Sequence, residues 1–104
     1  MKTVKQALID TKTILQTKDW CQGNYARDAN KKPVIASDPS AVSYCLVGAI
    51  WAATPIIDWH LRAEISECLQ LLNGNSIPTK WNDQKGRTKQ EVIDLLDKAI
   101  ASCF

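Results

Sequence analysis

The segment that follows Ser37-Asp38-Pro39 is apolar on every side of a helix, and this feature restricts the folds available to the chain. We expect the helix to span residues 39–53 with Asp38 as its N-cap, because an acidic cap followed by proline favours a helix start. A helix that is apolar all round is buried, so we place it at the centre of the fold, with Cys45 two turns inside it. Gly48 costs about 1 kcal/mol of helix propensity there, which predicts the close approach of another backbone.

Three further segments have the periodicity of amphipathic helices, over residues 3–18, 58–73 and 89–102. Their starts are marked by capping residues: Thr3 with Gln6 three residues later, Asp58, and Thr88 with Glu91. The sequence therefore predicts a single small domain over residues 1–104. We expect it to be mainly α, a compact bundle of about four helices around a buried central helix.

Two segments, 19–37 and 75–87, contain the glycine, asparagine and proline residues that interrupt helices. In the first, Tyr25-Ala26-Arg27 and Pro33-Val34-Ile35 are extended pieces that either pair as a short β-hairpin or stay irregular. Tryptophans stand near the start of one segment and within the other, so we expect both segments to be docked on the core.

Composition excludes several classes of protein. The 104 residues are 45% hydrophobic and 23% charged with a net charge of +2, which argues against a disordered tail and does not by itself imply nucleic acid. No apolar run reaches the roughly 18 residues of a membrane span, and no apolar signal segment is expected at the start. Four cysteines without a C-x-x-C pair then predict reduced thiols and a cytoplasmic protein.

Catalytic motifs are missing from the sequence. It contains no G-x-x-x-x-G-K-[ST], G-x-G-x-x-G or H-E-x-x-H pattern. Cys45 and His60 are the residue types of a thiol nucleophile and its base, but His60 and Glu64 are spaced as a solvated pair on a helix face. We therefore predict no catalytic residue, cofactor or metal site. Whether the protein is an enzyme stays open, although the sequence favours a protein that is not one.

Binding residues are expected in three places. Trp59 lies away from the buried stripe of its helix, which is typical of a partner contact or a dimer seam. The loop before the last helix either satisfies its own N–H groups through Asx turns or holds an anion at the helix start. The candidate residues of these places are Trp59, Arg27, Asp28, Trp81, Asn82, Asp83, Lys85, Arg87 and Lys89. The charged residues among them could also pair across the two irregular segments as a structural network.

An ordered set of short motifs runs along the chain: Trp20-Cys21-Gln22-Gly23, Tyr25-Ala26-Arg27-Asp28-Ala29, Tyr44-Cys45-Leu46-Val47-Gly48-Ala49-Ile50, Trp81-Asn82-Asp83, and Arg87-Thr88 with Glu91-Val92. The set resembles a domain-of-unknown-function family of small proteins from bacteria and their phages, over roughly residues 20–100. Asn30-Lys31-Lys32 departs from that pattern, which would have a glycine-containing turn here. The resemblance implies a small, mostly helical cytoplasmic domain and supplies no activity.

The leading functional hypothesis is a non-enzymatic module that binds a protein, a second copy of itself included. A mobile-element or phage protein that binds or inhibits a host complex belongs to this class. Two alternatives remain. One is binding of nucleic acid or an anionic ligand through the basic loop at 80–89. The other is a small enzyme of unknown reaction that uses Cys45, or the set Arg27, Asp28, Asp83 and Arg87. No membrane partner is expected.

Overall fold

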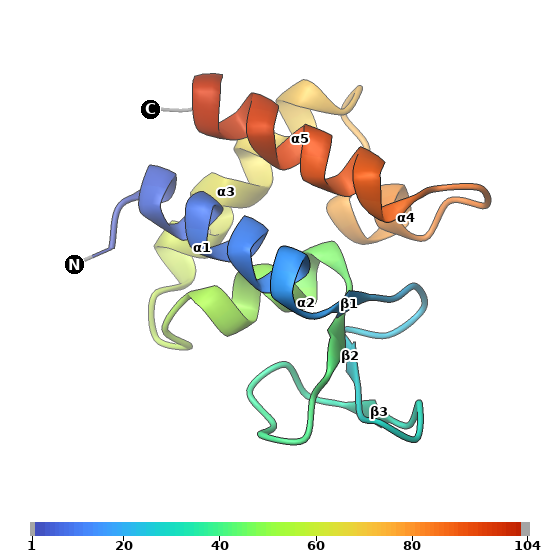
Figure 1. The fold of residues 1–104 in the computed structure, drawn as a ribbon. Coiled ribbons are helices and arrows are strands. Elements are labelled where there is room, and N and C mark those ends of the chain that lie inside the picture. Colours follow the sequence, from blue (N-terminus) through green and yellow to red (C-terminus); the bar gives the residue numbers. More distant parts are fainter. Residues whose placement is uncertain (1, 103–104) are drawn as a thin grey trace.

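The computed structural model describes residues 2–102, in which five helices enclose a core beside a small four-stranded sheet (Figure 1). The elements in chain order are α1 (Val4–Thr17), β1 (Asp19–Trp20), β2 (Ala26–Arg27), β3 (Pro33–Val34), β4 (Ser43–Tyr44), α2 (Leu46–Ala53), α3 (Trp59–Leu72), α4 (Pro78–Asn82) and α5 (Lys89–Ser102). The mainly α fold expected from the sequence is confirmed.

Helix α1 lies between α2 and α5, and α3 packs against α1 and α5 from behind in the view of Figure 1. The apolar stripes of these helices meet in one core. Its largest fully buried apolar side chains are Leu8, Leu15, Leu46, Ile65, Leu69, Val92 and Leu96. The sheet lies below α2, so the core is helical and the sheet forms a second, smaller region (Figure 1).

The capping residues expected for three helices are confirmed. The Thr3 hydroxyl accepts from the Gln6 backbone N–H at 3.1 Å, and the Asp58 carboxylate accepts from the Leu61 N–H at 3.1 Å. Thr88 and Glu91 form a reciprocal capping box in which each side chain accepts from the other's backbone N–H. These helices begin and end within one residue of their expected limits because caps and periodicity are local signals.

The central helix is shorter than the sequence predicted, so the expected span 39–53 is wrong at its start. Helix α2 begins at Leu46, and Ser43–Tyr44 form β4 instead. Asp38 caps a turn, where its carboxylate accepts from the Ser40 N–H at 2.8 Å. Cys45 is the N-cap of α2, and its sulfur accepts from the Gly48 N–H at 3.2 Å. Pairing of β4 with strands on both sides outweighs the local helix signal.

The sheet has the order β1-β4-β2-β3. Strands β1 and β4 run parallel, and β2 is antiparallel to both of its neighbours, β4 and β3. The register pairs Ala26 with Val34 and Arg27 with Pro33, so the hairpin alternative is confirmed. Lys31 has a φ of 64° in the hairpin loop. It occupies a left-handed position that usually favours glycine.

Two further features concern the irregular segments. The segment 75–87 was expected to lack regular structure, but it contains the short helix α4. Pro78 is the first residue of this helix, a position that favours proline. The segment after β1 brings the Tyr25 carbonyl so close to α2 that a Cβ atom on Gly48 would lie 1.8 Å from the Tyr25 oxygen. The close backbone approach predicted at Gly48 is therefore confirmed.

Candidate functional site

The carboxamide of Asn82, at the end of α4, is completely buried and joins three segments of the chain. Its oxygen accepts from the Trp20 indole N–H at 2.7 Å and from the Leu46 backbone N–H at 3.0 Å. Its nitrogen donates to the Cys21 carbonyl at 3.2 Å. In a continued parallel ladder Leu46 and Cys21 would bond each other, so this side chain replaces the next rung between β1 and the start of α2.

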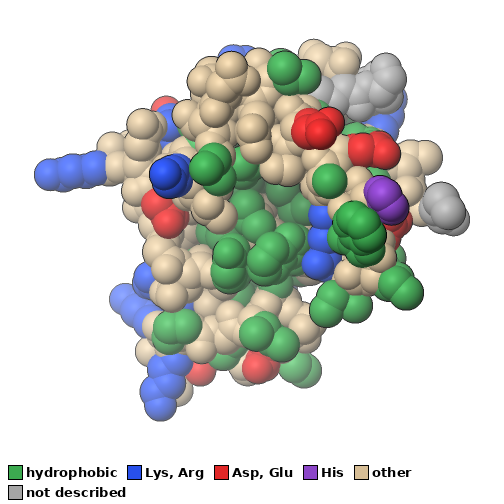
Figure 2. All heavy atoms as spheres, turned by 180° about the vertical axis from the view of Figure 1, so that it is seen from behind, with side chains coloured by type: hydrophobic (Ala, Val, Ile, Leu, Met, Phe, Trp, Pro, Cys, Tyr) green, Lys and Arg blue, Asp and Glu red, His purple; other side chains and the backbone are tan. Residues whose placement is uncertain are grey.

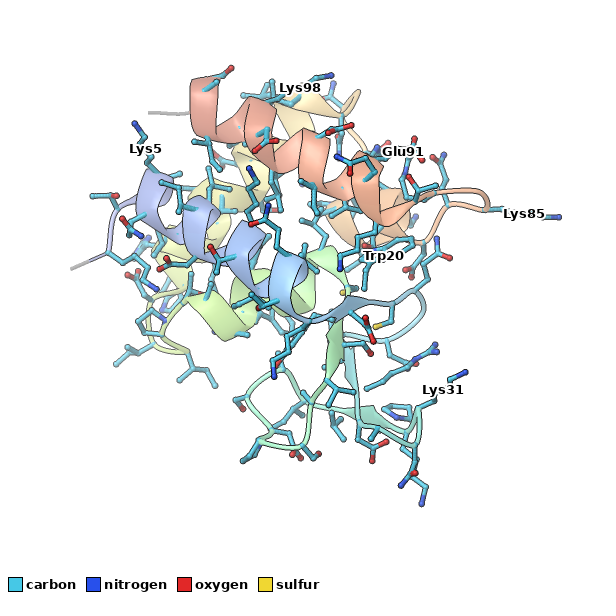
Figure 3. All side chains as sticks on the ribbon, in the orientation of Figure 1. Lys5, Trp20, Lys31, Lys85, Glu91 and Lys98 are labelled. Carbon is cyan, nitrogen blue, oxygen red and sulfur yellow. The ribbon has the colours of Figure 1, made fainter. Side chains whose placement is uncertain are left out.

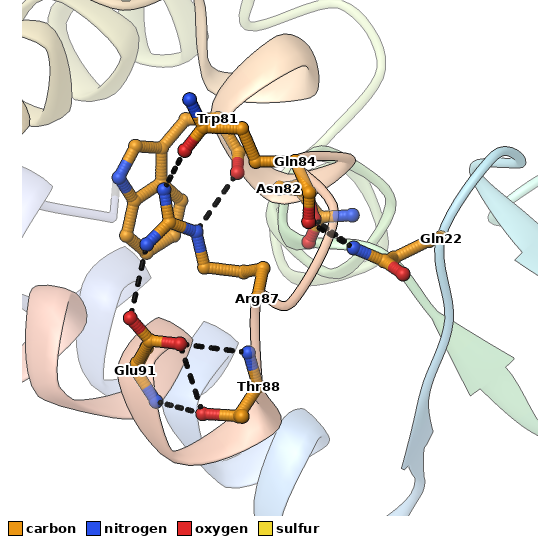
Figure 4. Close-up of polar contacts among 7 residues, drawn as sticks. All are labelled: Gln22, Trp81, Asn82, Gln84, Arg87, Thr88 and Glu91. Carbon is orange, nitrogen blue, oxygen red and sulfur yellow. Dashed lines mark hydrogen bonds and ion pairs between the residues drawn. The ribbon is translucent and has the colours of Figure 1, made fainter.

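The two irregular segments are held together by amide and backbone groups. The Asp83 carboxylate accepts from the Gly23 N–H at 3.0 Å, and the Gln22 side chain donates to the carbonyls of Asn82 and Gln84 at 2.8 and 3.0 Å (Figure 4). Asn82 and Asp83 thus satisfy N–H groups of distant segments rather than those of their own loop. This arrangement fixes the loop after β1 against α4.

Arg27 and Asp28 serve their own hairpin. The Arg27 guanidinium donates to the Asn24 side chain at 2.8 Å and to the Gln22 carbonyl at 2.7 Å. The Asp28 carboxylate accepts from the backbone N–H groups of Asn30 and Lys32. Among residues 2–102 no ion pair joins Arg27 or Asp28 to the loop before α5. The expected links between the two segments exist, but without the Arg–Asp pairs.

Arg87 makes four contacts within the protein through its guanidinium group (Figure 4). Its guanidinium lies 3.9 Å from the centre of the Trp81 ring, donates to the Trp81 carbonyl at 3.0 Å and forms an ion pair with Glu91 at 3.0 Å. It also donates to the Gln84 side-chain oxygen. The Thr88 backbone N–H, with Arg87 beside it, lowers the pKa of the Glu91 carboxyl. The positive charge of Arg87, just before α5, is therefore balanced by the Glu91 carboxylate of the same chain.

The remaining cations of the basic loop differ from one another. Lys89 donates its ammonium to the Lys18 carbonyl at 2.9 Å. Lys80 and Lys85 are exposed, and Lys85 projects away from the body of the molecule (Figure 3). An anion bound at this loop would therefore meet Lys80 and Lys85 first, with Arg87 and Lys89 already engaged.

The loop between α2 and α3 carries the most exposed apolar side chains of the described chain. Ile56 and Ile57 are each 83% exposed, and Trp59 is 66% exposed, as its sequence position predicted. The His60 ring stacks on the Trp59 indole with 4.4 Å between centroids and 20° between planes. We call Ile56, Ile57, Trp59 and His60 the Trp59 face.

A groove adjoins the Trp59 face. It has a volume of about 840 Å³, and its lining includes Tyr44, Trp51 and Ala52, with Ile35 and Ile56 also contributing. Figure 2 shows apolar side chains gathered around a hollow on this side of the molecule. We call this hollow the Trp51 groove. Ile56 belongs to both the Trp59 face and the groove, so the two adjoin, while charged side chains such as Arg62 and Asp38 also line the groove.

Arg62 fixes the loop that carries the Trp59 face. From the first turns of α3 it donates to the Thr54 hydroxyl at 2.8 Å, to the Thr54 carbonyl at 3.1 Å and to the Trp51 carbonyl at 3.2 Å. Its guanidinium carbon lies 5.5 Å from the Trp51 ring centre. These contacts cap the carbonyl end of α2 and fix Thr54, two positions before Ile56.

The cysteines do not present an activated nucleophile. Cys21 and Cys45 are free and buried, and burial raises the pKa of both thiols, to about 11 for Cys45. A catalytic cysteine needs the opposite shift. Cys68 is disulfide-bonded, so the expectation that all four thiols are reduced is wrong for this residue. Cys103 lies outside the described residues.

Sequence reasoning missed two parts of this arrangement. Asn82 was expected to act within its own loop, and nothing local indicates that it reaches Trp20 and Leu46. Ile56 and Ile57 were not singled out, although Thr54-Pro55-Ile56-Ile57 is an uncharged stretch between two helices, which is a usable signal of an exposed apolar tip. No three potential metal ligands lie together within residues 2–102.

None of the helices described is both long and apolar enough to cross a membrane. No curated protein and no solved structure matches the chain. A family model does match, over residues 1–102, and its members are described as a family of unknown function, DUF6197. The match spans the helical core, the sheet and both loops joined at Asn82. The chain therefore belongs to the DUF6197 family.

Proposed function

We propose that the protein is a non-enzymatic module that binds another protein through the Trp59 face and the Trp51 groove. One observation carries this proposal: Ile56, Ile57 and Trp59, within four consecutive positions, are 83%, 83% and 66% exposed. Burying a side chain of this size is worth about 1.5–3 kcal/mol. A partner that covers the three would gain binding energy that the free protein does not realise.

The surroundings of Trp59 favour recognition of a protein. Tryptophan is enriched at the energetic centres of protein interfaces. The His60 ring stacked on the indole restricts its motion, so less entropy is lost when a partner binds. Arg62 holds Thr54 at the start of the α2–α3 loop. Both contacts reduce the freedom that this region would lose on binding.

The Trp51 groove extends this surface. Ile56 forms part of its lining, which combines apolar side chains such as Tyr44 and Trp51 with polar ones. We propose that an apolar segment of the partner lies in this groove while the Trp59 face covers its flank.

The experiment uses the full chain with an affinity tag and two variants. Trp59→Ala removes the anchor, and Leu71→Ala is the matched control, because Leu71 is 79% exposed near the other end of the same helix. Proteins bound from a lysate of the native host are compared by quantitative mass spectrometry at low and high salt. We expect a partner that stays bound at high salt, is kept by Leu71→Ala and falls at least tenfold with Trp59→Ala.

Each other outcome contradicts the proposal in a distinct way. A partner retained equally by both variants would place the contact elsewhere. A concentration-dependent dimer seen by analytical ultracentrifugation, lost in Trp59→Ala, would identify the occupant as a second copy. Nucleic acid that is captured at low salt and lost at high salt would instead favour the basic loop.

We further propose that this activity belongs to a protein of a bacterium or its phage that binds or inhibits a host complex. The resemblance of the ordered motifs supports the origin, and the small size of the domain is compatible with that role. Identification of the captured partner tests it directly, since a component of a host assembly is expected.

A further inference from the structure

Cys21 and Cys45 each follow directly after one of two paired strands, β1 and β4. The parallel pair β1–β4 matches Trp20 with Tyr44, and continuing this register by one position would match Cys21 with Cys45. The Cys21 N–H donates to the Tyr44 carbonyl at 3.0 Å, which extends the ladder to this position. Register partners on paired strands share a face of the sheet, and their strands lie about 5 Å apart. This spacing falls within the Cα–Cα separations that a disulfide spans.

The surroundings of the two thiols agree with this placement. The Cys21 thiol hydrogen-bonds the Ser43 side chain, and Ser43 stands two positions before Cys45, on the same face of the chain. Burial raises the pKa of the Cys45 thiol to about 11, and the Cys21 thiol adds to this rise. Cys21 is 8% and Cys45 3% exposed, and both are free.

Each of the two cysteines borders a cavity. Cys45 lines one of about 520 Å³ together with Gly23, Asn24 and Tyr25. Cys21 lines another of about 460 Å³, and its sulfur donates to the Asn24 carbonyl at 3.6 Å. A molecule as small as hydrogen peroxide fits either space.

We propose that Cys21 and Cys45 form a reversible disulfide on exposure to hydrogen peroxide, joining β1 covalently to the start of α2. One of the two thiols reduces one peroxide molecule, which gives a sulfenic acid and one water. The other thiol then attacks this sulfur, forms the S–S bond and releases a second water. Two electrons and two protons pass from the thiols to the peroxide, and a dithiol reductant reverses the reaction.

The disulfide has two measurable consequences. It closes the chain between positions 21 and 45, which restricts the unfolded state, so oxidation should raise the melting temperature. Because burial raises the pKa of both thiols, oxidation should be slow at neutral pH and faster as the pH approaches the pKa of Cys45, about 11.

The test treats the folded full-length protein with peroxide, blocks remaining thiols with iodoacetamide and maps tryptic peptides without reduction. Trypsin separates Cys21 in peptide 19–27 from Cys45 in peptide 32–62, since the Lys32-Pro33 bond resists cleavage. We expect these two peptides to be linked, with the link removed by dithiothreitol and accompanied by a rise in melting temperature. Cys45→Ser, which keeps a capping oxygen, and Cys21→Ala should show neither effect.

Recovery of the two peptides as separate alkylated or sulfinic forms, or linked to other cysteine peptides, would overturn the proposal. Should a variant fail to fold, the wild-type protein alone decides through a dithiol reagent. One equivalent of phenylarsine oxide should protect Cys21 and Cys45 together from iodoacetamide. Protection of neither thiol, or of one alone, would show that the sulfurs do not meet.

Discussion

The Trp20 indole N–H donates to the side-chain oxygen of Asn82 across 62 positions of sequence, at 2.7 Å. This bond ties β1 to the end of α4. Trp20 points into the body of the fold, beneath α5 (Figure 3). The relationship predicts which single substitution will damage the structure most.

Replacing Asn82 with alanine should destabilise the fold by about 3 kcal/mol or more, because three buried groups lose their partner and each unsatisfied group costs about 1–3 kcal/mol. These are the Trp20 indole, the Leu46 N–H and the Cys21 carbonyl. Urea unfolding followed by circular dichroism measures the change. Lys85→Ala, at an exposed position, should leave the urea midpoint equal to that of the wild type within experimental error. Equal stability of the two variants would mean that Asn82 has no such role.

Gly48→Ala should lower stability although alanine is the better helix former by about 1 kcal/mol. The new Cβ would lie 1.8 Å from the Tyr25 carbonyl oxygen, and this backbone atom has to move. The matched change Ala52→Gly, at an exposed position of α2, should lower stability only by its helix propensity. Thermal melts compare them. A melting temperature above that of the wild type for Gly48→Ala would refute the contact.

Arg87 and Lys85 should behave differently when neutralised. Arg87→Ala loses the Trp81 stacking, the ion pair with Glu91 and the bond to the Trp81 carbonyl. We expect a loss of about 1–2 kcal/mol, within the usual range for point substitutions, and almost none for Lys85→Ala. If the basic loop binds nucleic acid, Lys85→Ala should instead weaken low-salt binding in a fluorescence anisotropy titration. Unchanged binding with Lys85→Ala would remove Lys85 from that hypothesis.

Acid should weaken the start of α5. The Thr88 N–H and Arg87 lower the pKa of Glu91 below its ordinary value of 4.5. A lowered folded-state pKa means that the charged form stabilises the fold at higher pH, and this contribution is lost as the pH falls through the folded pKa. The urea concentration at the midpoint of unfolding should therefore fall as the pH is lowered from neutral to below 4.5. Glu91→Gln, which keeps the capping geometry, should show a smaller fall, and an identical pH profile would argue against Glu91.

The parts of the fold that the sequence predicted are those set by signals local in sequence, such as helix caps. Thr3, Asp58 and Thr88 cap helices because each cap satisfies N–H groups within three residues. Asp38 carries the same signal but caps only a turn, since the strand pairing of Ser43–Tyr44 involves residues far away in sequence. The exposure of Trp59 followed from helix periodicity. The role of Asn82 did not, because its partners come from two distant segments.

The strands of the sheet are each two residues long, and its outer strands are β1 and β3. Pro33 in β3 has no backbone N–H to offer. An extended peptide added at either edge would therefore gain few main-chain hydrogen bonds, and edge-to-edge aggregation of folded molecules is disfavoured for the same reason. Recognition by strand addition is therefore disfavoured, which leaves the shape and chemistry of side chains as the better basis for selecting a partner.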